Sequence, residues 1–183
     1  MRRWIEMAFV AVSVAVAGLP AAAGAEETWH RVELDKGMTE FSLWGSFDAD
    51  ERDYAWLWFG GDVGFLVSPR HELGATVYLQ YVVFDWATAV GGACGGFYRY
   101  NVPIGSRRVV PFIGARAVGY LGEYSEWDAE LRAEAGIRHF TGNATAIDLT
   151  GYWGRRFGPD CEGAYCPDDA DRAGLSLGLS VFF

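Results

Sequence analysis

After Leu19 the sequence has no long apolar run, because charged residues and glycines interrupt every hydrophobic stretch that follows. A helix needs about 20 apolar residues to cross a bilayer, so a membrane crossing by the rest of the chain would have to use strands. Basic residues are also scarce, with 15 Lys and Arg against 24 Asp and Glu. This acidic balance argues against nucleic acid as a partner, which requires a basic surface.

Cysteine and histidine are rare, with three residues of each. Cys161 and Cys166 both lie in a segment rich in glycine, proline and aspartate, from 158 to 171. In an oxidising compartment this pair is a candidate disulfide that closes a small loop. A metal site is the weaker interpretation, because no third cysteine or histidine lies nearby. Cys94 would then be a lone thiol, and we expect it to have a packing role.

The first 25 residues have the three parts of a secretory signal. Arg2 and Arg3 form the basic start, an apolar stretch runs from Met7 to Leu19, and Ala23-Gly24-Ala25 ends it with small residues. We predict cleavage before Glu26. An uncleaved single-span anchor is the alternative, but the apolar stretch is shorter than the ~20 residues that a spanning helix needs. The sequence thus predicts export.

The remaining chain alternates apolar and polar residues in eight segments of about ten residues each, separated by turn residues, as is typical of strands in an outer-membrane barrel. The predicted strands are 38–47, 57–67, 72–84, 88–101, 109–121, 129–140, 144–156 and 172–183. Val32 and Leu34 have strand spacing as well, but a ninth strand would break the even count usual for such barrels. We therefore predict a periplasmic lead-in at 26–37 and, at 38–183, an all-β domain: an eight-stranded antiparallel up-and-down transmembrane β-barrel.

Alternation alone does not separate a membrane barrel from a soluble sheet, because both bury one face. In 129–140, however, charges of both signs share one face, and they would satisfy each other inside a narrow barrel. An eight-stranded barrel has just enough interior for side chains, so we expect a filled lumen and no conducting channel. A solvated sheet face is the alternative for these charges. The predicted lumen charge network is Asp62, Arg116, Glu130, Arg132, Glu134, Arg138 and Asp148.

Tryptophan and tyrosine collect where membrane proteins cross the headgroup layer. Such residues fall near one end of the predicted strands at Trp44, Trp56, Trp58, Trp86, Tyr120 and Trp153, and near the other end at Tyr98 and Tyr100. We interpret them as two aromatic belts, with core or loop packing as the alternative for any single residue. The short turns at 68–70, 103–108 and 141–143 would be periplasmic, and the connections 48–56, 85–87, 122–128 and 157–171 would face outward.

The last segment alternates most regularly and ends on an aromatic residue. Its apolar face contains Leu175, Leu177, Leu179, Val181 and Phe183. With seven further segments before it, this pattern resembles the small outer-membrane barrels of the OmpA and OmpX type. The resemblance implies that these five residues form the signal read by the barrel-assembly machinery during biogenesis. It also implies location in the bacterial outer membrane, with outer-membrane lipid and lipopolysaccharide as further partners, and we expect a monomer.

Barrels that this chain resembles in size include lipid A deacylases and palmitoyltransferases, and resemblance to the deacylases would imply a His-x-Ser pair as base and nucleophile. The nearest match is His139-Phe140-Thr141, which has threonine in place of serine and lies at the predicted periplasmic rim. We therefore predict no catalytic, cofactor-binding or metal-binding residues, no cofactor and no enzymatic activity. The outer loops concentrate acidic residues such as Asp48, Asp50 and Asp53, which could bind divalent cations, although solvated loops are the default.

The predicted function is that of a structural or surface-interaction protein, with a filled barrel that carries acidic extracellular loops. An outer-membrane lipid-modifying enzyme or a narrow small-molecule conduit is the alternative.

Overall fold

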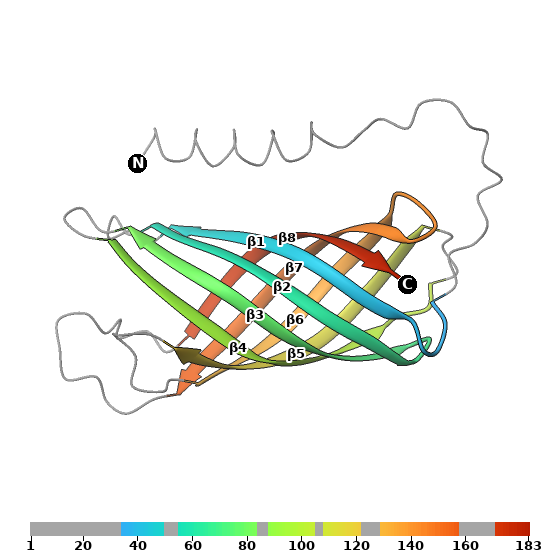
Figure 1. The fold of residues 1–183 in the computed structure, drawn as a ribbon, viewed down its shortest axis with the longest axis horizontal. Coiled ribbons are helices and arrows are strands. Elements are labelled where there is room, and N and C mark those ends of the chain that lie inside the picture. Colours follow the sequence, from blue (N-terminus) through green and yellow to red (C-terminus); the bar gives the residue numbers. More distant parts are fainter. Residues whose placement is uncertain (1–33, 50–54, 84–87, 105–107, 122–128, 158–170) are drawn as a thin grey trace.

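The computed structural model describes residues 34–49, 55–83, 88–104, 108–121, 129–157 and 171–183. Within these ranges, no helix is long and apolar enough to span a membrane. The described chain is instead made of eight antiparallel strands that close into one barrel (Figure 1). The strands are β1 (Thr39–Ala49), β2 (Ala55–Ser68), β3 (His71–Val83), β4 (Thr88–Asn101), β5 (Val109–Leu121), β6 (Ala129–Phe140), β7 (Thr145–Phe157) and β8 (Asp171–Phe182).

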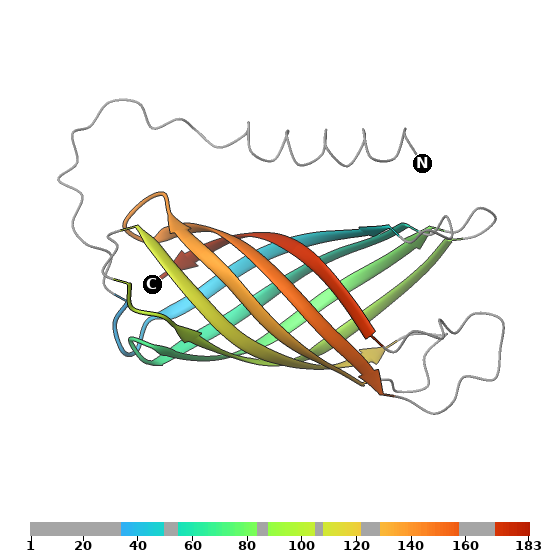
Figure 2. The ribbon, with the colours of Figure 1, turned by 180° about the vertical axis from the view of Figure 1, so that it is seen from behind.

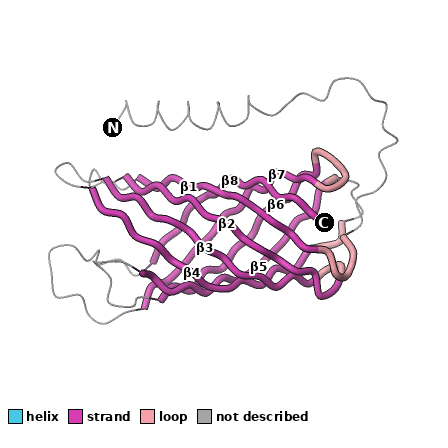
Figure 3. The backbone as a smooth tube through the Cα atoms, in the orientation of Figure 1, coloured by secondary structure: helices cyan, strands magenta, loops and turns pink. Residues whose placement is uncertain are grey.

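The predicted fold is confirmed, and every strand boundary lies within two residues of its expected position. Each strand pairs with its neighbours in the chain, and β1 pairs with β8 to close the barrel. The turns that follow β2, β4 and β6 gather at one end together with the C-terminus, as Figure 3 shows in pink. We call this end the turn end, and the opposite end, where β1, β3, β5 and β7 end, the loop end.

The two faces of the sheet have the reverse of the polarity found in a soluble protein. Large apolar side chains point outward and are exposed, among them Phe59, Val77, Leu79, Ile113, Leu131 and Leu175. Charged side chains point inward, and Glu130 and Arg138 are fully buried. An outward apolar band around a polar interior is typical of barrels in a lipid bilayer. The charges of β6 therefore lie inside the barrel rather than on a solvated sheet face.

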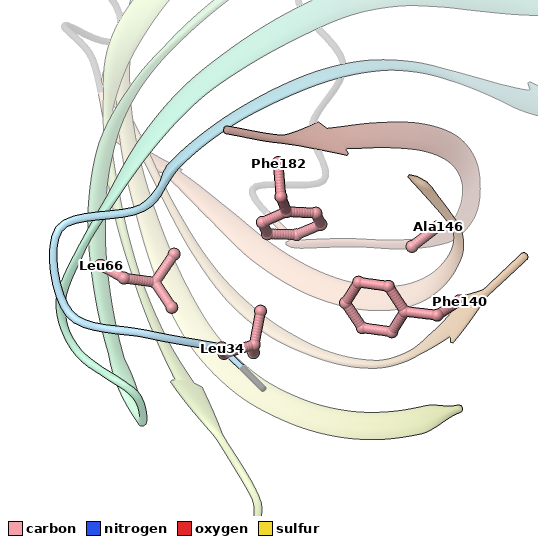
Figure 4. Packing of buried hydrophobic residues seen from close by; sticks show 5 residues of the cluster. All are labelled: Leu34, Leu66, Phe140, Ala146 and Phe182. Carbon is pink, nitrogen blue, oxygen red and sulfur yellow. The ribbon is translucent and has the colours of Figure 1, made fainter. Parts of the chain in front are cut away.

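An apolar cluster closes the turn end of the lumen. Leu34, Leu66, Phe140, Ala146 and Phe182 pack there and are all buried (Figure 4). Leu34 belongs to the predicted lead-in, and the chain returns from it to β1 across this end of the barrel. The Gly37 N–H donates to the carbonyl oxygen of Leu66, and the Leu66 N–H donates to the carbonyl oxygen of Met38. Gly37 has a φ of 95°, a left-handed conformation that favours glycine.

Leu34→Ala is expected to lower the free energy of unfolding of the refolded protein by about 2 kcal/mol, because it removes buried methyl groups from this cluster. Urea unfolding followed by tryptophan fluorescence measures the change. The control is Ile104→Ala, because Ile104 lies in a turn and is exposed. Equal stability of Leu34→Ala and the parent protein would show that the lead-in does not pack in the barrel.

A second buried cluster fills the half of the lumen nearer the loop end. Trp58, Tyr78 and Tyr120 meet edge to face, with ring centroids 5.4 to 6.4 Å apart. Trp44 packs against the same group. Trp44, Trp58 and Tyr120 therefore follow the core-packing alternative and not the aromatic belt, because they point into the lumen. Trp153 and Tyr98 do lie on the outer face, whereas Trp56 and Trp86 fall outside what the structure describes at side-chain level.

Candidate functional site

Between the two apolar clusters lies a layer of buried charges. It contains six carboxylates, Glu40, Asp62, Glu72, Glu130, Glu134 and Asp148, and four guanidiniums, Arg99, Arg116, Arg132 and Arg138. All ten side chains come from inward positions of the strands. A buried charge is costly unless it is paired and hydrogen-bonded, so the contacts within this layer decide whether the barrel is stable.

Arg138 of β6 pairs with the carboxylates in the part of the charged layer nearest the turn end. Its Nη2 lies 2.7 Å from Glu40 Oε2, its Nε 3.1 Å from Asp148 Oδ1, and its Nη1 3.5 Å from Glu72 Oε2. The Ser180 hydroxyl lies 2.9 Å from Glu40 Oε1 and 2.6 Å from Asp148 Oδ2. One guanidinium thus connects carboxylates from β1, β3 and β7.

Asp62 of β2 lies in the middle of the layer, where its carboxylate accepts hydrogen bonds from two arginines. Arg99 Nη2 lies 2.7 Å from Asp62 Oδ2, and Arg116 Nη1 lies 2.8 Å from Asp62 Oδ1. The Trp44 indole N–H also donates to Asp62 Oδ1, over 3.0 Å. Arg116 Nε donates to Glu134 Oε1 at 2.6 Å. These bonds link β1, β2, β4, β5 and β6 across the lumen.

Arg132 and Glu130 pair where the charged layer meets the aromatic cluster. Arg132 also donates to the Tyr78 hydroxyl, and the Tyr120 hydroxyl donates to Glu130. The Arg132 guanidinium stacks over the Tyr152 ring, 4.9 Å from its centroid. Cation–π contacts of this kind are favourable where water is excluded.

All seven residues of the predicted charge network lie in this layer, and Glu40, Glu72 and Arg99 belong to it as well. These three were missed, although each alternates with an outward apolar or aromatic neighbour. Arg99 lies between Tyr98 and Tyr100, which we had placed in an aromatic belt. The available signal was the alternation of each strand, because a charged residue between two outward apolar or aromatic neighbours faces inward.

The predicted assembly signal faces outward on β8. Leu175, Leu179 and Phe183 are exposed, and Leu177 and Val181 are partly exposed. Cys161 and Cys166, the candidate disulfide, lie outside the described residues, as do the acidic side chains of the long connections. Cys94 is a free thiol on the outer face.

The described side chains include no group of three or more His, Cys, Asp and Glu that could hold a metal ion. His139 lies exposed on the outer face of β6, and Thr141 interacts with Thr145 within the turn. The arrangement of buried ion pairs can hold the wall of the barrel in one geometry and can block a continuous water path.

No family model and no curated protein match the chain. Solved structures do. Neisserial surface protein A has a TM-score of 0.58 at 15% identity, over 80% of this chain and 96% of that one. The N-terminal β-barrel domain of Pseudomonas aeruginosa OprF has a TM-score of 0.55 at 12% identity, over 81% and 98%. The outer membrane protein OprG from the same organism has a TM-score of 0.53 at 11% identity, over 84% and 99%. The chain therefore has the fold of the small eight-stranded outer-membrane β-barrels.

Proposed function

We propose that this protein is a non-conducting outer-membrane anchor, a barrel that spans the bilayer and holds the connections of its loop end at the cell surface. The observation that carries the proposal is the polarity of the sheet, which exposes apolar side chains and buries ten charged ones. Such a surface is costly in water and favourable in lipid. The fold of the similar solved structures supports the same environment.

A closed lumen supports the non-conducting character. The apolar cluster around Phe140 and Phe182 blocks the turn end, and the cluster around Trp58 and Tyr120 blocks the half nearer the loop end. Between them the charges are paired side chain to side chain. A conduit for ions would need a water-filled path through all three layers, and an eight-stranded barrel has little interior to spare.

The proposal includes export with removal of the first 25 residues, periplasmic placement of the turn end and insertion as a monomer. Lipid and lipopolysaccharide would contact the outer face, and the barrel-assembly machinery would read the β8 residues that end in Phe183. No enzymatic activity is proposed, because the charges of the lumen are held by each other rather than aimed at a substrate.

Refolding into detergent, followed by electrophoresis with and without boiling, tests the membrane barrel. We expect a faster-migrating band without boiling, because a closed barrel stays compact in detergent. The same preparation in a planar bilayer is expected to show no channel conductance. Absence of the mobility shift would contradict the membrane barrel, and steady conductance would favour the narrow conduit. A changed lipid A mass profile in cells that lack the gene would favour the enzyme.

A further inference from the structure

The seam between β1 and β8 is paired over only part of its length. Pairing runs from Glu40 and Phe182 to Ser46 and Ser176. Beyond this last pair, β1 continues to Ala49 and β8 extends back to Asp171. At each of the other seven seams, pairing toward the loop end reaches the end of at least one strand. The two strands diverge at the loop end in both ribbon views (Figures 1 and 2).

This open part of the seam lies at the height of the outward apolar band. Ala173, on the unpaired part of β8, pairs on its other side with Trp153 of β7, which is exposed on the outer face. Exposed tryptophan collects where acyl chains meet head groups. If the barrel spans the membrane as proposed above, the open seam faces that boundary. Unpaired backbone groups there are costly unless a polar group accompanies them.

A polar cavity lies behind the paired part of the seam, next to the point where pairing ends. Ser42 and Trp44 of β1 and Ser176 of β8 line it on the seam side, and Arg99 and Glu134 line it on the opposite wall. Its interior has room for roughly one water-sized group. Trp44 and Ser176 face inward yet are only partly buried, whereas Arg99 and Glu134 are 5% and 7% exposed. Ser42 on the seam side is buried as well, so of these five residues only Trp44 and Ser176 are partly accessible.

Two polar atoms in the wall of this cavity form an ion pair with each other but make no hydrogen bond to the part of the chain that the structure describes. Arg99 Nε and Glu134 Oε2 are buried without a hydrogen bond from the described residues, and they lie 4.0 Å apart. One oxygen that accepts from Arg99 and donates to Glu134 would satisfy both. Both charges also have other ion-pair partners, because Arg99 pairs with Asp62 and Glu134 pairs with Arg116. The cavity therefore suits an uncharged hydroxyl better than an ionic head group.

We propose that the loop-end part of the β1–β8 seam is a lateral entrance for a single-chain amphiphile with an uncharged hydroxyl head, of which a long-chain primary alcohol is the simplest member. The hydroxyl enters between the strands and binds between Arg99 and Glu134. The first carbons of the chain pass between the strands, and the rest of the alkyl chain stays outside, against the outward leucines of β1 and β8. This inference rests on the proposed position of the barrel in a membrane.

The test titrates the full refolded chain with 1-dodecanol, dodecane and dodecanoate, and follows the Trp44 indole N–H by nitrogen-15 NMR. The Trp44→Phe variant assigns the resonance. We expect a saturable shift with the alcohol and no saturable shift with the alkane or the carboxylate. A protein that shows the heat-dependent mobility shift of a folded barrel but does not respond to the alcohol would overturn this inference and leave the proposed function intact. Failure to obtain a heat-shifted barrel would count against the proposed function itself.

Two variants distinguish the cavity from general partitioning of alcohol into the detergent. Ser176→Leu fills the cavity and is expected to weaken binding by about tenfold or more, which corresponds to at least about 1.4 kcal/mol. The control is Leu177→Ala on the outer face of the same strand. An unchanged titration in a folded Ser176→Leu barrel would place the alcohol elsewhere.

A second pair of variants closes the seam. Phe47 and Leu175 are the positions that would pair next if the register of Ser46 and Ser176 continued. In a chain with the native cysteines changed to serine, Phe47→Cys with Leu175→Cys is expected to lose binding when oxidised and regain it when reduced. Leu43→Cys with Leu179→Cys crosslinks positions that are already paired and is expected to bind in both states. Equal binding by both oxidised proteins would overturn the lateral entrance.

Discussion

Arg138→Met is expected to lower the free energy of unfolding of the refolded barrel by about 3–5 kcal/mol, the usual cost of removing one partner from a buried ion pair. Arg138 is fully buried, and its guanidinium contacts Glu40, Glu72 and Asp148. Methionine fills a similar volume but leaves three carboxylates without their shared cation. Urea unfolding in detergent micelles, followed by tryptophan fluorescence, measures the loss.

Two further variants separate the buried contact from a general effect of lost positive charge. Arg70→Met removes an exposed arginine from the turn after β2, and we expect a change of less than about 0.5 kcal/mol. Adding Glu40→Gln to Arg138→Met is expected to recover part of the stability, because the double variant carries one uncompensated charge fewer. If Arg138→Met were as stable as Arg70→Met, the charged layer would contribute little to folding.

Gly95→Ala is expected to lower the free energy of unfolding by about 3 kcal/mol or more, or to prevent refolding, because the added methyl group meets backbone rather than a flexible side chain. A Cβ at position 95 of β4 would overlap the carbonyl oxygen of Ala117 and lie 2.7 Å from the Cα of Val118. Neither atom of β5 can move without disturbing the pairing of the two strands. The yield of the heat-shifted band and the urea midpoint are the measurements.

Gly119→Ala is the matched control, since Gly119 lies on β5 and pairs with Cys94, the residue before Gly95. A Cβ at Gly119 would meet nothing within 4 Å. We expect this variant to fold with unchanged or slightly raised stability, because alanine loses less backbone entropy than glycine. Comparable loss in both variants would indicate that glycine is needed for flexibility during insertion and not for the close approach of β4 to β5.

Glycine has another role in the lumen, where it leaves room for large side chains. A Cβ at Gly60 would overlap the Trp44 ring, and a Cβ at Gly136 would meet the Phe112 ring. The aromatic and charged layers therefore depend on glycines of neighbouring strands. This complementarity supports a packed interior, because Trp44 and Phe112 each occupy a space that a glycine of a neighbouring strand leaves free.

The strands and their faces were predictable because a strand places successive side chains on opposite sides. Leu175, Leu177 and Leu179 share one face for that reason, and so do Glu130, Arg132 and Glu134. The eight segments and the short turns between them then imply an antiparallel meander. Its closure by β1 and β8 follows from the cost of an unpaired edge in lipid.

Whether an aromatic residue contacts lipid or packs in the lumen was less predictable. Trp44, Trp58 and Tyr120 have the composition of an aromatic belt, yet they face inward and pack on one another. Periodicity assigns them to the inner face as readily as it assigns Asp62. Composition left both a membrane belt and core packing open for these residues, and only the folded barrel decides between them. Leu34 is a similar case, because its packing with Phe182 depends on how the chain crosses the turn end.

The amino-acid sequence alone was sufficient for the features that the two-residue alternation predicts. These are the strands, their two faces, their order and the charged character of the interior. Only the folded barrel shows which charges meet. Arg138 contacts Glu40 although 98 residues separate them in the chain, and Ser180 contacts Glu40 across 140 residues. The partial opening between β1 and β8 depends on the stagger of all eight strands. Such contacts arise when the sheet closes on itself, and a pattern that repeats every two residues carries no information about that closure.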